Sequence, residues 1–238
     1  MRAPNIQAIL LDFDGTLVDS EFLHYDCWSR AVAPYGAKIG WEDYQRRLVG
    51  RTDIEAGKIL LSEAGHDPTP DLLGAVCAHK HQGYRRRFCD ELTIESEILE
   101  WIARRPAHLQ LGLVSSSSTQ EVEPLLIQEN IRTSFDFIVL GDHVSRHKPH
   151  PEPYQRAIGY LNQGGLSDPP SATIVFEDSD SGVASAQAAG LRVRRVRSPK
   201  ELLPAIREEL SRCPKANSHS ERGLRYSSNG QARRVGRG

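Results

Sequence analysis

Two aspartates stand one residue apart where an apolar run near the start of the chain ends. The run covers residues 9–11. Asp12 and Asp14 come next, and Gly15 and Thr16 follow them. Side chains two residues apart on an extended strand point to the same side, so both carboxylates are expected at one side of a strand end. Carboxylates this close repel each other, and a divalent cation is their natural partner. Taken alone, the pattern also fits an ordinary turn with a surface acid.

Polar side chains follow three further apolar runs. A serine cluster that includes Ser115 and Ser116 opens a predicted helix, where hydroxyls and free backbone N–H groups bind anions. Lys148 stands before a proline-rich turn and suits a phosphate as a point charge. Glu177 and Asp178 end the last of these runs. Each feature alone also fits helix capping or a solvated lysine. Together with the aspartate pair, however, they make four polar motifs at the ends of apolar runs, and the probability that all four occur there by chance is small.

Short apolar runs alternate with longer helical patterns along most of the chain. The expected strands cover residues 6–13, 109–115, 135–141, 172–178 and 191–196. The expected helices among them cover residues 94–105, 119–129, 152–161, 181–189 and 200–211. This alternation predicts an α/β fold with a parallel sheet and helices on both faces. Ligands of such sheets bind at the carboxyl ends of the strands, where the polar residues stand.

A purely helical insert separates the first two expected strands by about ninety residues, far more than a crossover helix needs. Ser20 is expected to cap its first helix, and further helices are expected at 41–48, 53–64 and 70–88. We therefore divide the chain into a core of residues 1–19 and 89–213 and a small helical domain of residues 20–88. Residues 214–238 hold six Lys or Arg against one acid, so we expect a disordered basic tail.

The composition excludes several classes of protein. With 238 residues, 39% hydrophobic and 26% charged side chains, the chain is typical of a soluble globular protein. A formal net charge of −1 gives no reason to expect nucleic acid as a partner. The four cysteines form no CxxC pair, and we find neither a signal peptide nor a run that could span a bilayer. We expect a cytoplasmic protein with reduced thiols.

Together the four motifs resemble those of the haloacid dehalogenase-like superfamily. The segments DFDGTLVDSE, LVSSSS, KPHPEPY and FEDSDSGVASAQAAG occur in the family's order, and the resemblance covers residues 6–196. It implies a Rossmann-like core with an inserted all-helical cap that closes over the site. It also implies a phosphatase rather than a dehalogenase, because dehalogenase members lack an aspartate at the position of Asp14.

The resemblance implies a catalytic role for four residues. Asp12 is the expected nucleophile, which attacks phosphorus and becomes an aspartyl-phosphate. Asp14 is the expected general acid and base, and its first task requires a raised pKa in the working complex. Ser115 and Lys148 are expected to hold the transferring phosphoryl group.

The same resemblance implies a Mg²⁺ site. Asp12 and Asp178 are expected to bind the ion through their carboxylates, Asp14 through its backbone carbonyl, and Glu177 directly or through water. Phosphoryl transfer asks a protein mainly for positioning and charge stabilisation, which Mg²⁺ and Lys148 supply.

Candidate substrate-binding residues lie in both parts of the chain. Thr16 and Ser116 offer hydroxyls beside the predicted catalytic residues. In the cap, His24 lies on the first helix, Arg51 in a helix–helix loop and Lys80 before a basic run. Packing within the cap is the alternative for His24, and a surface position is the alternative for Lys80.

The resemblance is closest to the branch with beta-phosphoglucomutase and many sugar-phosphate phosphatases. The mutase has Arg in its cap loop where this chain has Asp53, so we favour a Mg²⁺-dependent phosphatase over a sugar phosphomutase. The expected partner is a small phosphorylated molecule, such as a sugar phosphate, with no membrane and no nucleic acid, and we expect a monomer. The hypothesis of another class is a non-catalytic protein whose basic tail contacts a polyanion. The intact catalytic motifs argue against it.

Overall fold

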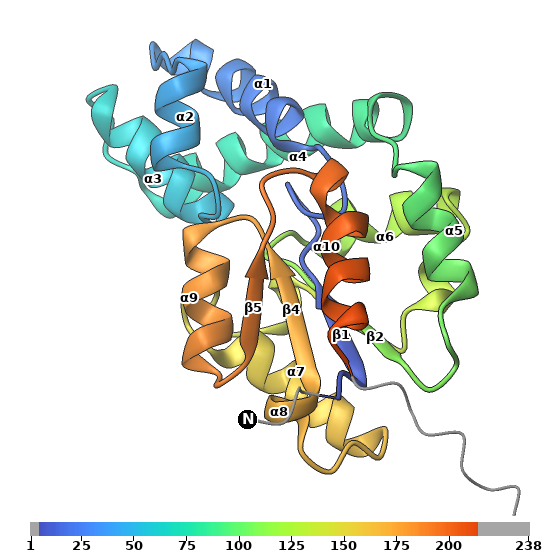
Figure 1. Cartoon of the computed structure of the whole chain (residues 1–238). Coiled ribbons are helices and arrows are strands. Elements are labelled where there is room, and N and C mark those ends of the chain that lie inside the picture. Colours follow the sequence, from blue (N-terminus) through green and yellow to red (C-terminus); the bar gives the residue numbers. More distant parts are fainter. Residues whose placement is uncertain (1–4, 214–238) are drawn as a thin grey trace, which may run out of the picture.

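The computed structural model describes residues 5–213, which form an α/β fold around one parallel sheet (Figure 1). The five strands have the order β3-β2-β1-β4-β5. They are β1 (Ala8–Leu11), β2 (Gln110–Val114), β3 (Phe137–Val139), β4 (Thr173–Glu177) and β5 (Arg192–Arg195). Each strand lies inside a range predicted from the sequence, and the predicted fold class is confirmed.

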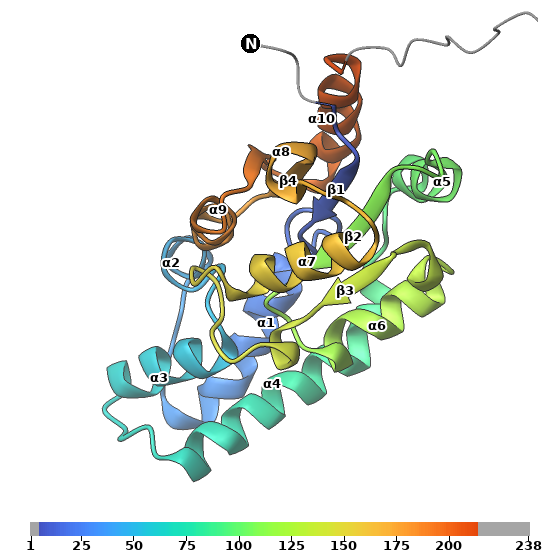
Figure 2. The same ribbon diagram turned by 90° about the horizontal axis from the view of Figure 1, so that it is seen from below.

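Helices cover both faces of the sheet because its central strands are apolar on both faces. The helices of this part are α5 (Ser96–Arg104), α6 (Thr119–Gln128), α7 (Glu152–Gln163), α8 (Pro169–Ala172), α9 (Asp180–Ala188) and α10 (Pro199–Ser211). On one face α5, α6 and α10 pack around a cluster with Leu11 and Phe176, and on the other α7 and α9 pack around Leu10 and Val175. Figure 2 looks along the strands, with α5 and α10 on one side and α7 and α9 on the other.

Four α-helices lie between β1 and α5 and pack on one another. They are α1 (Glu21–Val32), α2 (Trp41–Arg47), α3 (Asp53–Glu63) and α4 (Pro70–Glu91). Their shared apolar cluster includes Trp28, Leu60 and Val76. Figure 1 shows these helices beyond the arrowheads of β4 and β5, so they face the carboxyl ends of the strands. We propose that this segment, residues 20–88 in our division, is a cap over a core.

In the cap, α2 and α3 end one residue before the predicted position, and two larger differences concern α4 and the start of α1. α4 ends at Glu91 rather than at residue 88, and the i,i+4 pair of Arg87 Nε and Glu91 Oε1, 2.6 Å apart, supports the added turn. Ser20 precedes α1 as predicted, but its side chain makes no capping hydrogen bond, so that prediction is wrong. Its hydroxyl donates instead to Asp14 Oδ1 at 2.5 Å.

Two further features of the described residues concern membrane spans and cysteines. Among residues 5–213, no helix is long and apolar enough to cross a membrane. All four cysteines lie in this range, and none is joined to another by a disulfide. The predicted basic tail, residues 214–238, lies outside the described residues.

Candidate active site

The carboxyl ends of the central strands meet the cap at one cavity. Its volume is about 920 Å³, a size typical of small-molecule sites. Its lining includes Asp12, Lys148 and Asp178 from the core and His24 and Arg51 from the cap. The cavity thus brings together most of the side chains that the sequence singles out.

Lys148 is the buried cation of the core side of the cavity. Its Nζ atom lies 2.7 Å from Asp12 Oδ1, 2.5 Å from Glu177 Oε1 and 2.9 Å from the carbonyl oxygen of Val114. Burial opposes the charge, but the two carboxylates raise the pKa of Lys148 well above its usual value. Lys148 is therefore a fixed positive charge beside the predicted nucleophile.

Three carboxylates crowd around this lysine. Oxygen atoms of Asp12, Glu177 and Asp178 all lie within 4.8 Å of one another. Burial and the charge of Glu177 raise the pKa of Asp12 and raise that of Asp178 to about 8. One ammonium group does not balance three carboxylates, and carboxylate oxygens are the ligands that Mg²⁺ prefers. The donor set therefore fits a divalent cation.

Gly15 lets the loop after β1 pass close to the acid cluster. Its φ of 77° lies in the left-handed region, and a Cβ atom there would lie 2.2 Å from Asp178 Oδ2. A larger residue would displace the Asp178 carboxylate. Thr16, predicted to bind substrate, is fully buried on the same loop, and its hydroxyl lies 3.5 Å from Asp178 Oδ1. The structure thus places Thr16 against the acid cluster.

Glu177 is held by donors on both carboxylate oxygens. Lys148 and the Tyr154 hydroxyl, the latter at 2.9 Å, donate to Oε1. The backbone N–H and the hydroxyl of Ser179 donate to Oε2 at 3.3 and 3.1 Å. Tyr154 is fully buried, and Lys148 Nζ lies 5.2 Å from the centre of its ring. Sequence reasoning missed Tyr154, although it ends the motif KPHPEPY that starts at Lys148.

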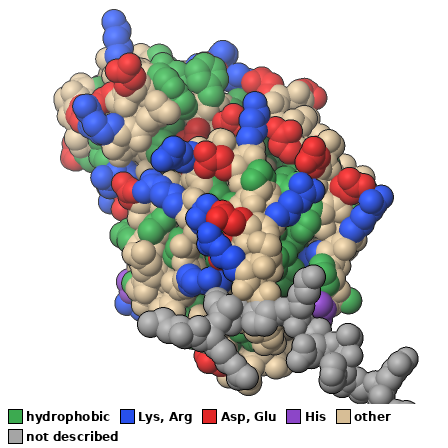
Figure 3. Space-filling view, viewed as in Figure 1, with side chains coloured by type: hydrophobic (Ala, Val, Ile, Leu, Met, Phe, Trp, Pro, Cys, Tyr) green, Lys and Arg blue, Asp and Glu red, His purple; other side chains and the backbone are tan. Residues whose placement is uncertain are grey.

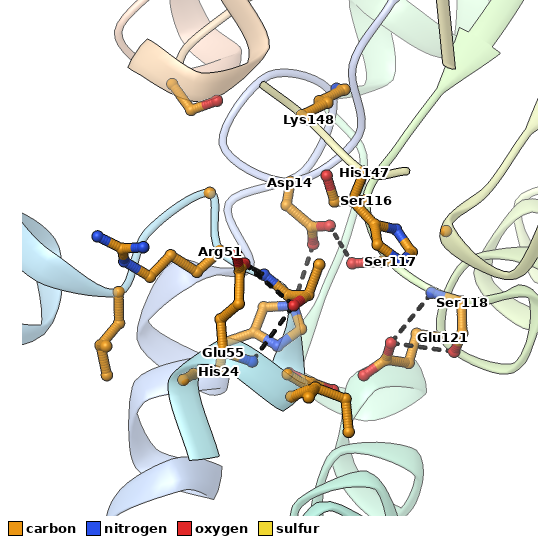
Figure 4. A pocket seen from close by; sticks show the side chains of 18 of the residues that line it. Asp14, His24, Arg51, Glu55, Ser116, Ser117, Ser118, Glu121, His147 and Lys148 are labelled. Atoms are coloured by element: carbon orange, nitrogen blue, oxygen red, sulfur yellow. Dashed lines mark hydrogen bonds and ion pairs between the residues drawn. The ribbon is translucent and has the colours of Figure 1, made fainter. Parts of the chain in front are cut away.

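Asp14 accepts hydrogen bonds on both of its carboxylate oxygens (Figure 4). Ser20 Oγ and His24 Nε2 lie 2.5 and 3.1 Å from Oδ1. Ser117 Oγ and Ser115 Oγ lie 2.6 and 3.5 Å from Oδ2. Burial opposes ionisation, but these hydrogen bonds, that from His24 foremost, lower the pKa of Asp14 below its usual value. The direction is opposite to the raised pKa that proton donation by Asp14 alone requires.

His24 is the group that can carry the proton instead. Burial and the charge of Lys80 lower its pKa, but the hydrogen bond and charge of Asp14 outweigh them, and the pKa of His24 is raised. Its ring stacks on the ring of Tyr84, with centroids 4.4 Å apart. A proton on His24 Nε2 can therefore be shared with Asp14. Packing within the cap does not account for this contact, because Asp14 belongs to the core.

The serine side chains after β2 have two roles. Some lie at the cavity or contact Asp14, and Ser118 caps the start of α6. Ser115 is buried, and its hydroxyl accepts a hydrogen bond from the Ser117 backbone N–H at 3.0 Å. Ser116 lines the cavity. Ser118 begins α6 with a capping box to Glu121. Sequence reasoning missed Ser117, whose hydroxyl makes the shorter contact with Asp14.

Lys80 is a buried residue that links the cap to the core. Its side chain is 1% exposed, and its Nζ atom lies 2.7 Å from Glu121 Oε1 and 3.0 Å from Asp53 Oδ2. The alternative of a surface lysine is therefore wrong. The two carboxylates compensate the charge of Lys80, which makes its burial possible. Arg51, by contrast, is exposed, and its Nε donates to the carbonyl oxygen of Arg47 at 2.6 Å.

Relatives of known activity share the sequence pattern. A phosphorylated carbohydrates phosphatase of Thermotoga maritima is 32% identical over 190 residues, which is 78% of this chain and 82% of that protein. The fructose-1-phosphate phosphatase YqaB of Escherichia coli is 29% identical over 79% of this chain and 95% of that protein.

Solved structures share the fold. CbbY from Rhodobacter sphaeroides in complex with phosphate gives a TM-score of 0.70 at 28% identity and covers 81% of this chain and 87% of its own. A mutant of CbbY in complex with xylulose-(1,5)-bisphosphate gives the same TM-score and identity, over the same shares of the two chains. The family model described as haloacid dehalogenase-like hydrolase matches residues 9–196. With the motifs, the sheet and the site in agreement, the chain belongs to the haloacid dehalogenase-like hydrolase family.

Proposed function

We propose that the protein is a Mg²⁺-dependent phosphatase that hydrolyses a small phosphomonoester, such as a sugar phosphate, through an aspartyl-phosphate on Asp12. The observation that carries the proposal is the 2.7 Å contact of Asp12 with Lys148, beside Glu177 and Asp178, at the wall of the cavity. The relatives named as phosphatases of phosphorylated carbohydrates and of fructose 1-phosphate support a phosphoric monoester hydrolase.

The first displacement uses Asp12 as the nucleophile. A carboxylate oxygen of Asp12 attacks phosphorus, and the bond from phosphorus to the leaving-group oxygen breaks. Lys148 stabilises the negative charge on the phosphoryl oxygens. Asp14 receives a proton from His24 across their 3.1 Å contact and passes it to the leaving-group oxygen, which leaves Asp14 ionised and His24 neutral.

The second displacement releases inorganic phosphate. Asp14 accepts a proton from a water molecule, the water oxygen attacks phosphorus, and the bond from phosphorus to Asp12 breaks. The hydrogen bonds from Ser20 and Ser117 favour the ionised form of Asp14 that this step needs. The proton taken from water returns the Asp14–His24 pair to its starting state.

The acid cluster would hold the divalent cation. Asp12 and Asp178 would bind it through their carboxylates and Asp14 through its backbone carbonyl. When bound, the cation supplies positive charge against the phosphoryl oxygens and favours ionised carboxylates. Burial and the neighbouring charge of Glu177 raise the pKa of Asp178 to about 8, and a cation beside its carboxylate would offset both effects. Glu177 adds charge beside the cation and holds Lys148 in place.

Hydrolysis is favoured over the phosphomutase reaction. A mutase must grip the second phosphate of its intermediate in the cap. The residue that replaces the mutase arginine is Asp53, and its carboxylate already pairs with Lys80 at 3.0 Å. The relatives named above are phosphatases.

The surface of β5 gives no support to a polyanion-binding protein. Blue and red side chains alternate on the face shown in Figure 3. Arg194 pairs with Glu208 at 2.8 Å and Arg195 with Asp180 at 2.5 Å. Because acids pair with these arginines, this face offers a mixed surface rather than the basic stripe that nucleic acid requires.

The proposal is tested with p-nitrophenyl phosphate and with a panel of metabolite monophosphates, each with Mg²⁺ or with a chelator. We expect Mg²⁺-dependent release of phosphate that Asp12→Asn abolishes. The matched control is Asp71→Asn, which removes an exposed carboxylate in the first turn of α4. Full activity of pure Asp12→Asn protein would overturn the nucleophile. Conversion of a hexose 1-phosphate to the 6-phosphate without release of phosphate would establish a mutase.

A further inference from the structure

The Lys80 network, formed by Asp53, Lys80, His81 and Glu121, lines the cap side of the cavity. Asp53 begins α3, Lys80 and His81 lie on α4, and Glu121 lies on α6. Since phosphoryl transfer takes place at the strand ends, this network faces the leaving group of the substrate. Phosphomonoesters differ in their leaving groups, so the Lys80 network lies where one substrate can be distinguished from another.

The lysine of the network is engaged by protein carboxylates. Its Nζ atom donates to Glu121 Oε1 at 2.7 Å and to Asp53 Oδ2 at 3.0 Å. His81 Nε2 lies 2.5 Å from the same Asp53 oxygen. Ser118 fixes the other oxygen of Glu121, with its N–H at 3.2 Å and its hydroxyl at 3.0 Å. The network is therefore a preformed set of paired charges, and its lysine is not a free anion site.

The cap side of the cavity carries more acids than cations to balance them. Asp53 and Glu121 outnumber Lys80, and Glu21 and Glu55 line the same cavity. A second phosphate group in this region would approach carboxylates while the lysine is already paired, and like charges at close range cost several kcal/mol. Sugar hydroxyls, by contrast, donate well to carboxylates.

Arg51 does not offset the excess of acids over cations on the cap side of the cavity. Its side chain is exposed, and in Figure 4 its guanidinium points away from Asp14 and Lys148. A charge at an exposed position is screened by water and salt. Arg51 can attract anionic substrates to the cavity without binding a second phosphate at the Lys80 network.

A metal ion at the network is a weaker explanation of the same residues. Ligand atoms of Asp53, His81 and Glu121 lie within 4.8 Å of one another. The ammonium group of Lys80 already contacts the oxygens of both acids, so it occupies the place of a cation.

We infer that the Lys80 network makes the enzyme selective for monophosphates of uncharged polyhydroxyl compounds and excludes bisphosphates. The inference rests on the proposed phosphatase function and goes beyond it, because the relatives alone leave both substrate classes open. It makes Asp53 and Glu121 specificity-determining residues that act on the leaving group and not on the phosphorus.

The test compares a hexose monophosphate with the corresponding hexose bisphosphate as competitors of p-nitrophenyl phosphate hydrolysis and as substrates. Competition reports binding even for a compound that is not turned over. For the wild type we expect the monophosphate to bind, and to be hydrolysed, about tenfold or more in preference to the bisphosphate.

Variants that release Lys80 are expected to weaken this preference for the monophosphate. In the double variant Asp53→Asn with Glu121→Gln, the lysine loses both charged partners and becomes free to pair with a second phosphate. We expect the ratio of the two inhibition constants to shift by about tenfold toward the bisphosphate. Asp53→Asn alone gives a smaller shift in the same direction, and it serves if the double variant does not fold.

The matched control is Asp26→Asn. Asp26 is an acid of α1 that pairs with Arg30 Nε at 2.8 Å and with Arg87. Its loss removes one cap charge, and we expect the ratio to stay as in the wild type. A wild type that binds both compounds equally, or a ratio that the network variants leave unmoved, refutes the inference. Absence of p-nitrophenyl phosphate hydrolysis in the wild type would instead count against the proposed function.

Discussion

At the scale of single residues, Lys148 supplies the positive charge that compensates the buried carboxylates of Asp12 and Glu177. Its ammonium group has three protein acceptors, two of them carboxylates, and is almost wholly buried. A buried charge of this kind is costly unless it is paired, and the same holds for the carboxylates that pair with it. Lys148 therefore stabilises Asp12 and Glu177 through the same contacts that hold its ammonium group at the wall of the cavity.

Replacement of this lysine is predicted to lower stability as well as activity. In Lys148→Met, with a chelator present, Asp12 and Glu177 lose their buried partner, and the free energy of unfolding falls by about 3–5 kcal/mol. Urea denaturation measures the loss. Turnover of p-nitrophenyl phosphate falls to background.

The control for this prediction is Lys38→Met, since Lys38 is exposed on the cap. We expect its free energy of unfolding to change by less than about 0.5 kcal/mol. Equal stability of the Lys148 variant and the control would contradict the role of Lys148 as a compensating charge.

At the scale of elements, one loop of the cap rests directly on the core. The carbonyl oxygen of Gly50, between α2 and α3, accepts a hydrogen bond from Ser181 Oγ on α9 at 2.9 Å. A Cβ atom at Gly50 would lie 2.6 Å from the same Ser181 oxygen, and its φ is 75°. Glycine thus allows the loop to close against α9 beside the cavity.

Gly50→Ala is predicted to weaken closure of the cap. The left-handed backbone costs about 1–2 kcal/mol for a residue with a Cβ, and the contact with Ser181 in addition forces the loop away from α9. We expect KM for small phosphomonoesters to rise several-fold. Steady-state kinetics, with thermal unfolding of the same samples, measures both effects.

Gly65→Ala separates the two causes. Gly65 also has a positive φ, 81°, but among the described residues nothing lies within 4 Å of a Cβ placed there. We expect a similar loss of stability and an unchanged KM. A KM that rises equally in both variants would show that backbone strain alone, rather than the contact with α9, causes the effect.

At the scale of the whole molecule, the acid cluster couples stability to pH. Burial and the neighbouring Glu177 raise the pKa of Asp178 to about 8, and the pKa of His24 is also raised. A group whose pKa is higher in the folded than in the unfolded state stabilises the fold below that pKa, and the contribution is lost as pH rises through it. Both contributions to stability are therefore lost as pH rises, that of Asp178 by about pH 8.

Without divalent cations, stability is predicted to fall between about pH 6 and pH 8. Loss of the Asp178 contribution lowers the melting temperature by roughly 5 °C over this interval. Saturating Mg²⁺ removes the decline, because the cation favours the ionised cluster. Thermal unfolding in chelator and in Mg²⁺ measures the two curves. Parallel curves would contradict binding of the cation at Asp12 and Asp178.

Local patterns in the sequence are enough to predict the sheet and the main catalytic motifs. The apolar runs that end at Asp12 and Glu177 form buried strands, because a parallel strand is covered on both faces and needs no alternation. The apolar pattern extends some strands by two residues. For example, it includes Phe13, a turn residue that lies beyond the end of β1 at Leu11.

Local patterns are enough to predict the α/β fold, the helical insert and the acids, serine and lysine at the strand ends. Strand and helix periods are local, and a parallel sheet brings its strand ends to one edge. Other contacts of the site depend on the packing of distant segments. Ser117 lies on Asp14 from a separation of 103 residues, and Lys80 pairs with Glu121 across 41. The first contact depends on the pairing of β1 with β2 in the sheet, and the second on how the cap packs against the core. The burial that results from this packing makes Lys80, which the sequence alone leaves as a possible surface residue, a compensated internal charge.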